Sequence, residues 1–208
     1  MDQIAAGGPD AVSLNGIART MGMAPAGFYR YFENREALIA DLVVDAYNAL
    51  ADAIEMAGRS PANSEQRFTA VTSTFRAWAV DQPNAYRLIF QTIRGSGRDL
   101  PAASRSTGVI LTCLSALAVR PPRALGDRNG EASSLDDQLA SWAERTETMG
   151  LPPRLLALGV ACWTRLHGVI SLELSQHLAA TGIDPQLFYE AEVATLIEQA
   201  QDPGAGEF

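Results

Sequence analysis

The side chains of this 208-residue chain that can form strong polar contacts gather in one short stretch, GFYRYF at residues 27–32. Tyr29, Arg30 and Tyr31 follow one another there, and phenol and guanidinium groups donate hydrogen bonds to phosphate oxygens. The two histidines, His167 and His177, lie ten residues apart, which is the wrong spacing for a paired metal site. The sequence contains no nucleophile elbow or phosphate-binding loop. It therefore predicts a binding protein with no catalytic residue, metal or cofactor.

Two short helices must position the tyrosines and the arginine. Ser13 is a good N-cap for a helix that runs to Met21, Gly22 ends that helix, and Pro25 suits the first turn of the next one. Two helices joined by a tight glycine turn form a helix-turn-helix unit, here at residues 13–32. An aromatic-rich packed helix with no DNA role is the alternative interpretation.

The second of these helices is expected to enter a major groove, because small residues at its start let the backbone approach base edges. Phe28 and Phe32 are expected in the core, whereas the tyrosines are expected to contact the DNA backbone. The predicted DNA-binding residues are Ser13, Ala24, Ala26, Gly27, Tyr29, Arg30, Tyr31 and Arg35.

The rest of the chain predicts an all-α protein of about nine helices, because apolar residues recur at spacings of three and four. Asn34 caps a long helix from Arg35 to Ala57, and Gly58 follows it. We expect a DNA-binding domain at 1–58, whose first helix is shortened to residues 1–6, and a helical domain at 59–208. The second domain is expected to hold one uninterrupted helix from 153 to 180, and residues 120–134 form a flexible connection.

Residues 12–43, VSLNGIARTMGMAPAGFYRYFENREALIADLV, resemble the DNA-binding domain of the TetR/AcrR family of transcriptional regulators. That family starts its second helix with Ser or Thr followed by an Ile-Ala pair, and it ends its third with a Tyr-x-Tyr-Phe or Tyr-x-His-Phe run. A basic residue and Glu-x-Leu then open the fourth helix. The matching residues are Ser13, Ile17, Ala18, Gly22, Pro25, Tyr29, Tyr31, Phe32, Arg35, Glu36 and Leu38.

A second resemblance covers residues 75–90 and 163–174, which are similar to the ligand-binding domain of a subgroup named for its Trp-His-Gly pattern. Trp163, His167 and Gly168 fill that pattern. Together the two resemblances imply a cytoplasmic, dimeric regulator that binds double-stranded operator DNA and responds to a small-molecule effector, as a repressor does.

The N-terminal region departs from the family in its charge. Residues 1–45 carry three arginines against six carboxylates, and phosphate neutralisation supplies much of the affinity for DNA. Either the start of the first helix is missing or DNA binding is weak. The alternative function is therefore a helical small-molecule-binding or interaction protein with a weakened DNA-binding domain.

The second domain is expected to form the dimer and to hold the effector. The helix at 153–180 is apolar on nearly all sides, so all of its faces must be buried. This predicts a dimer interface through Leu166, Ile170, Leu174, Val193 and Ile197. A central core helix in a monomer is the alternative. Aromatic residues on different helices are expected to line an apolar cavity, namely Phe75, Trp78, Tyr86, Phe90, Trp142 and Trp163, together with His167. Ordinary core packing is the alternative for each of them.

The overall composition fits this interpretation. The net charge is −8 and hydrophobic residues make up 47 %, which is enough for a packed core. The two cysteines predict buried free thiols rather than a disulfide framework. The longest apolar run, residues 155–163, is far shorter than the ~20 residues of a membrane span, so no membrane partner is expected.

Overall fold

The computed structural model describes residues 3, 11–60, 63–91, 101–118, 134–145 and 151–202. Apart from Gln3, the shortened first helix predicted at 1–6 lies outside these residues, as does the connection predicted at 120–134 except for Ser134. The described residues form helices, turns and loops without a strand, which confirms the predicted all-α class.

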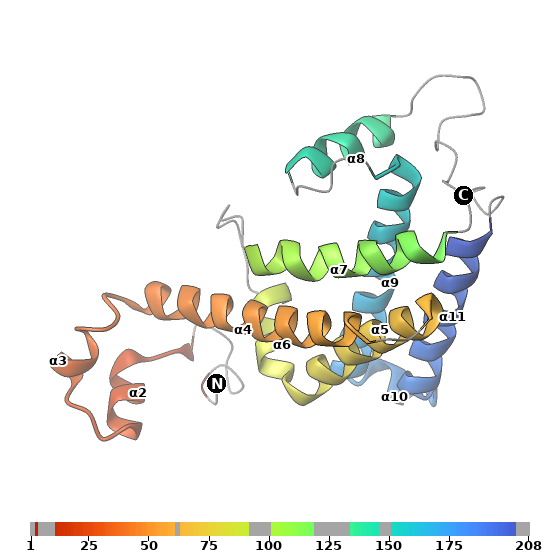
Figure 1. The fold of residues 1–208 in the computed structure, drawn as a ribbon. Helices are drawn as coiled ribbons and strands as arrows, with labels where there is room; N and C mark the ends of the chain where they lie inside the picture. The colour runs from red at the N-terminus through yellow and green to blue at the C-terminus, as the bar shows by residue number, and fades with distance from the viewer. Residues whose placement is uncertain are drawn as a thin grey trace.

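Ten helices occur in the described residues. They are α2 (Leu14–Thr20), α3 (Pro25–Phe28), α4 (Arg35–Gly58), α5 (Ser64–Asp81), α6 (Pro83–Gln91), α7 (Pro101–Leu117), α8 (Ser134–Arg145), α9 (Pro153–Leu174), α10 (His177–Thr181) and α11 (Pro185–Gln201). Figure 1 shows α2 and α3 standing apart from the body at one end of α4, while α7 runs alongside the other part of α4.

The long helix α4 joins the two regions of the molecule. Its N-cap is Asn34, whose side-chain oxygen accepts a hydrogen bond from the Ala37 amide at 2.8 Å, as predicted. Its inner face packs against α5, α6 and α7, where Leu50 and Ile54 are almost completely buried. Because α4 is long and rigid, a tilt of the helix at its C-terminal end displaces α2 and α3 at its N-terminal end.

Gly58 has a different role from the predicted helix stop. It is the last residue of α4 itself, and a Cβ atom there would lie 2.9 Å from Val109 Cγ1 of α7. Because such a contact is too close for carbon atoms, the missing side chain is what lets the end of α4 pack directly on α7.

The core of the second region is built around α9, which packs against α5, α7, α8, α10 and α11. Tyr189 of α11 is buried and donates a hydrogen bond to the Thr72 carbonyl of α5 at 2.7 Å. By length and composition α9 is apolar enough to cross a membrane. Its neighbours on several sides place it as a core helix.

The uninterrupted helix predicted from 153 to 180 is wrong. The helix α9 ends at Leu174, Gln176 adopts a left-handed backbone with φ of 65°, and α10 begins at His177. A left-handed residue is usually glycine, so a glutamine at this position carries no local signal of the break. Gly182 then ends α10 in the same conformation, with φ of 75°.

Candidate functional site

The helix-turn-helix unit has the local chemistry that its sequence predicts. The Ser13 hydroxyl accepts a hydrogen bond from the Gly16 amide at 3.2 Å and so caps α2. Gly22 holds the turn with φ of 68°, and the Met23 amide donates to the Ala18 carbonyl at 2.8 Å. Leu14 and Ala18 are buried and join the main core, so the unit is packed onto the base of α4.

The helix that should enter the groove is shorter than predicted. The helix α3 ends at Phe28, and residues 29–31 form turns. Gly27 lies inside this four-residue helix, where glycine costs roughly 1 kcal/mol relative to alanine, and this favours the early end. The side chain of Phe28, predicted as core, lies outside the described part, whereas Phe32 packs partly buried against the core.

Most of the predicted DNA-binding residues are exposed. Tyr29 is 46 % and Tyr31 75 % exposed, so both phenol groups are accessible to a partner such as DNA. Ser13, Ala24, Ala26 and Arg30 are also exposed, and Gly27 and Arg35 are half-buried. A Cβ atom at Gly27 would meet no atom within 4 Å. Arg35 lies against Glu36, with Nε and Nη2 donating to Oε1 at 3.2 and 3.1 Å.

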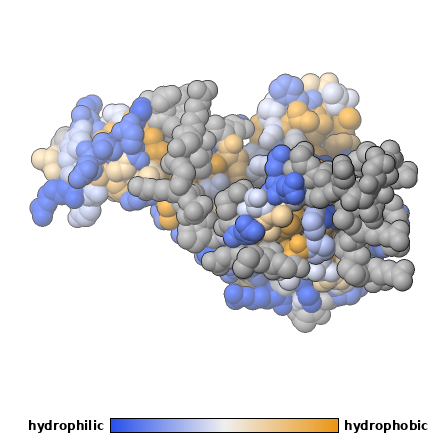
Figure 2. Space-filling model, turned by 90° about the horizontal axis from the view of Figure 1, so that it is seen from above, coloured by the Kyte–Doolittle hydropathy of each residue, from blue (hydrophilic) through white to orange (hydrophobic). Residues whose placement is uncertain are grey.

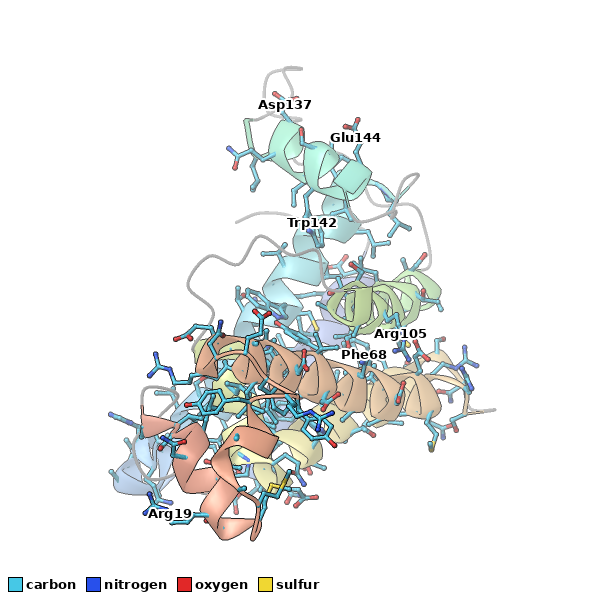
Figure 3. All side chains as sticks on the ribbon, turned by 90° about the vertical axis from the view of Figure 1, so that its left-hand side faces the viewer. Arg19, Phe68, Arg105, Asp137, Trp142 and Glu144 are labelled. Atoms are coloured by element: carbon cyan, nitrogen blue, oxygen red, sulfur yellow. The ribbon has the colours of Figure 1, made fainter. Side chains whose placement is uncertain are left out.

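Arg19 is a further candidate that the sequence reasoning missed. It lies in the last turn of α2 and is exposed, and Figure 3 shows it at the lower edge of the unit. In helix-turn-helix proteins the first helix crosses the DNA backbone, where an arginine binds phosphate. The sequence could have identified Arg19 by its position at the end of a short helix with a clear N-cap. In Figure 2 the projecting part that holds α2 and α3 carries much hydrophilic surface.

Five of the seven predicted effector residues meet in one place, which we call the His167 group: Phe75, Tyr86, Phe90, Trp163 and His167. The His167 ring centroid lies 4.2 Å from that of Phe90, 4.8 Å from Trp163 and 5.0 Å from Phe75. Its Nδ1 lies 2.9 Å from the Tyr86 hydroxyl, which is also 3.0 Å from Ser171 Oγ. These rings contact one another directly, so an effector here would have to displace one of them.

The other two predicted effector residues lie elsewhere. Trp78 is partly buried against the main core. Trp142 of α8 packs against a separate cluster of Leu111, Leu139, Ala143 and Leu156. Figure 3 shows Trp142 on the side of α8 that faces α9, while Asp137 and Glu144 point away. Trp142 therefore anchors α8 on α9, and a single cavity lined by all seven residues is wrong.

Comparison with known proteins decides the family. Residues 1–42 match the model of bacterial regulatory proteins of the tetR family, and residues 68–196 match the tetracyclin repressor-like C-terminal domain. The chain belongs to the TetR family. The model for residues 68–196 does not specify the Trp-His-Gly subgroup, which stays a prediction.

Relatives of this TetR-family chain are regulators. It is 29 % identical over 202 residues to the HTH-type transcriptional regulator Rv1816 of Mycobacterium tuberculosis, covering 91 % of this chain and 84 % of the relative. The figures are the same for Mb1846 of Mycobacterium bovis. Among solved structures, regulatory protein SCO4313 is similar, with 33 % identity, a TM-score of 0.76 and coverage of 95 % and 90 %. The chain is thus a transcriptional regulator with a helix-turn-helix domain.

The predicted dimer residues of this TetR-family regulator need correction. Leu166, Ile170 and Val193 are buried inside the single chain, and Leu174 and Ile197 are partly buried against the same core. Leu166, Ile170 and Val193 therefore do not lie on an exposed surface of the single chain, whereas an interface role for Leu174 and Ile197 stays a prediction. The exposed face of α9 carries Val160, Trp163, Thr164, Gly168 and Leu172 instead, a stripe at helical spacing.

Within the part of the chain that the structure describes, His, Cys, Asp and Glu side chains form no group of three that could hold a metal. His177 is exposed and lies next to Ser175, whose hydroxyl is 2.8 Å from His177 Nδ1. Cys113 and Cys162 are buried free thiols, and burial raises the pKa of Cys162 to about 12.

The stability of this TetR-family fold should depend on His167 at mildly acidic pH. Burial lowers the pKa of His167 to about 4, from an ordinary value of 6.5. As the pH falls below 6.5, the unfolded chain binds a proton at His167 that the folded chain does not bind. The contribution of the neutral, buried His167 to the free energy of unfolding is therefore fully present above pH 6.5. It is lost as the pH falls toward 4, by at most about 3 kcal/mol at 1.36 kcal/mol per pKa unit.

Urea unfolding at pH 7.5, 6.5 and 5.5 measures this loss. The variant His167→Phe should lose less free energy of unfolding over this range than the wild type, because it removes the buried imidazole. Equal slopes for His167→Phe and the wild type would contradict the prediction.

Proposed function

We propose that this chain is a homodimeric, operator-binding repressor whose affinity for DNA falls when a small-molecule effector binds the second domain. The observation that carries the proposal is the exposed surface of Tyr29, Arg30 and Tyr31, held on a capped helix-turn-helix unit at the end of α4. The protein acts in the cytoplasm and has no catalytic role of its own. We place the boundary between its domains at residue 58, where α4 ends.

The dimer is proposed to form through the exposed faces of α9 and α11. These two helices pack side by side. Trp163 is 51 % and Leu172 43 % exposed on α9, and Leu187 is 65 % exposed on α11. Exposed apolar side chains on two neighbouring helices favour an interaction surface, and a second copy of the chain offers the same surface in return. An operator with two half-sites needs two helix-turn-helix units, one for each half-site, because the half-sites lie about one helical turn, ~34–36 Å, apart.

Two groups of variants distinguish contacts with the DNA backbone from recognition of the base sequence. Tyr29→Phe, Tyr31→Phe and Arg35→Ala should each weaken binding to all sequences alike, by ~1 kcal/mol, because each removes one donor to phosphate. Gly27→Ser should instead change sequence preference while leaving the fold intact, since a side chain there meets nothing within 4 Å.

Fluorescence anisotropy with a selected operator and a scrambled duplex, over a range of salt, distinguishes the two groups. Arg30→Ala belongs with Gly27→Ser, and Gln138→Ala on α8 is the matched control away from the unit. If Arg35→Ala leaves both the affinity and its salt slope unchanged, the predicted contact of Arg35 with the DNA backbone is wrong.

The alternative function, a helical small-molecule-binding or interaction protein with a weakened DNA-binding domain, has one observation in its favour. The N-terminal region is acidic, and Glu36 lies against the guanidinium of Arg35. DNA must compete with that carboxylate for the arginine. Loss of measurable binding to any duplex at low salt would favour this alternative.

A further inference from the structure

The start of α2 carries only half of an ordinary capping box. In that motif the N-cap side chain accepts a hydrogen bond from the amide of the third helical residue, and a Glu or Gln at that third position accepts one from the N-cap amide. Ser13 makes the first of these hydrogen bonds, to the Gly16 amide. Gly16 occupies the third position and has no side chain that could make the second. The Ser13 amide therefore needs an acceptor from elsewhere.

Gln3 supplies that acceptor from outside the helix. Its side-chain Oε1 accepts a hydrogen bond from the Ser13 amide at 2.7 Å, across ten positions of the sequence. This is the contact that a glutamine at position 16 would make in an ordinary capping box. The two halves of the cap thus come from separate segments of the chain.

Glycine at position 16 makes room for Gln3. A Cβ atom there would lie 2.8 Å from Gln3 Nε2, so a larger residue would push the amide group of Gln3 aside. Glycine weakens a helix relative to alanine, and α2 has only seven residues. The contact with Gln3 offsets part of that loss.

The helix α5 shows the ordinary form of the same cap. The Asn63 side chain accepts a hydrogen bond from the Gln66 amide at 2.8 Å, and the Gln66 side chain accepts one from the Asn63 amide at 3.4 Å. Both partners belong to one continuous segment, so this cap stabilises α5 without tying it to another part of the chain. The split cap of α2 ties two segments together.

We propose that Gln3 is a positioning residue for DNA binding, which fixes the start of α2 by completing its cap and does not contact DNA itself. A helix as short as α2 is not stable alone, so contacts at its ends determine how firmly it is held. In helix-turn-helix proteins the first helix crosses the DNA backbone, and α2 also packs against α3. A loosened α2 therefore displaces α3 as well. This consequence rests on the proposed function, whereas the capping role does not.

Amide hydrogen exchange, measured by NMR on the full chain without DNA, tests the cap. Gln3→Ala should speed exchange of the Ser13 amide about fivefold, as expected for one lost hydrogen bond. Gly16→Gln creates an ordinary capping box and displaces the Gln3 side chain, so adding Gln3→Ala to it should have no further effect on the Ser13 amide. Gln66→Ala is the matched control, which should speed exchange at Asn63 and leave Ser13 unchanged.

Fluorescence anisotropy with a duplex selected by the wild type tests the consequence for DNA. Gln3→Ala should weaken binding about fivefold or more, by the same lost hydrogen bond. The double variant Gln3→Ala/Gly16→Gln should bind as Gly16→Gln alone does. Gln66→Ala should bind as the wild type does, because it removes an equivalent cap from the second domain. This control separates positioning of α2 from a general loss of stability.

Each role of Gln3 has results that would overturn it. The capping role is wrong if the Ser13 amide is unprotected in the wild type, or if Gln3→Ala leaves its exchange unchanged. The positioning role is wrong if exchange becomes faster while DNA affinity stays the same, or if Gln3→Ala still weakens binding in the Gly16→Gln background. Because the exchange measurement contains no DNA, it decides the capping role independently of whether the chain binds an operator.

Discussion

The variant Gly168→Arg is expected to be a folded monomer that has lost most of its affinity for operator DNA. Gly168 lies in the middle of the exposed face of α9, and a Cβ atom there would meet nothing within 4 Å in the single chain. An arginine is therefore tolerated by the protomer but blocks a second copy. Loss of the second copy's helix-turn-helix unit should lower operator affinity by about a hundredfold or more.

Light scattering measures the mass, which should be near the 22.2 kDa of one chain for this variant and twice that for the wild type. Ser141→Arg on α8 is the control, since it also adds an arginine at an exposed site. Ile170→Arg should instead unfold the protein, because that side chain is buried. A wild type that runs as a monomer at micromolar concentration, or a dimeric Gly168→Arg variant, would contradict the proposed interface.

The second large effect concerns the ion pair between Arg76 of α5 and Glu173 of α9. The guanidinium donates two hydrogen bonds, from Nε to Oε2 at 2.9 Å and from Nη2 to Oε1 at 2.6 Å. The side chains are only 19 % and 15 % exposed. Glu173→Ala leaves the guanidinium poorly solvated and without its carboxylate, which should lower the free energy of unfolding by about 3 kcal/mol.

Urea unfolding compares this variant with the double variant Arg76→Met/Glu173→Leu, which removes both charges and should recover much of the loss. Glu36→Ala breaks an exposed pair and should cost far less than Glu173→Ala, because Glu36 is 69 % exposed and water screens its charge. If Glu173→Ala and Glu36→Ala cost the same, the pair does not tie α5 to α9 as described.

Local signals in the sequence predicted where helices begin. Ser13 and Asn34 each accept a backbone hydrogen bond at a helix start, because their side-chain oxygens satisfy amides that the helix leaves open. Such contacts lie within three residues, so spacing in the sequence is enough to find them. The residues of the helix-turn-helix unit were found for the same reason.

Contacts between distant helices were not predictable in this way. The apolar composition of α9 could not say that Leu166 and Ile170 face α9's own neighbours while Trp163 faces solvent. Gly58 reads as a helix stop until Val109 is known to lie against it.

The His167 group connects α9 to α4 through the side chains of α6. Phe90 contacts His167 and also Tyr47 of α4, whose ring centroid is 5.9 Å away. The Tyr47 hydroxyl donates to the Ile89 carbonyl at 3.4 Å. Trp163, which contacts His167, is on the face proposed for the dimer. The packing of these rings thus links α4, which carries the helix-turn-helix unit, to the exposed face of α9.

Selection of genomic DNA fragments tests the central claim most directly. Sheared DNA from the source organism is incubated with the wild type and with a variant that combines Tyr29→Phe, Arg30→Ala and Tyr31→Phe, and bound fragments are sequenced. The account predicts enrichment by the wild type of a few sites, each with two inverted half-sites about one helical turn, ~34–36 Å, apart, and loss of that enrichment in the variant. Equal recovery of all fragments by both proteins would contradict it.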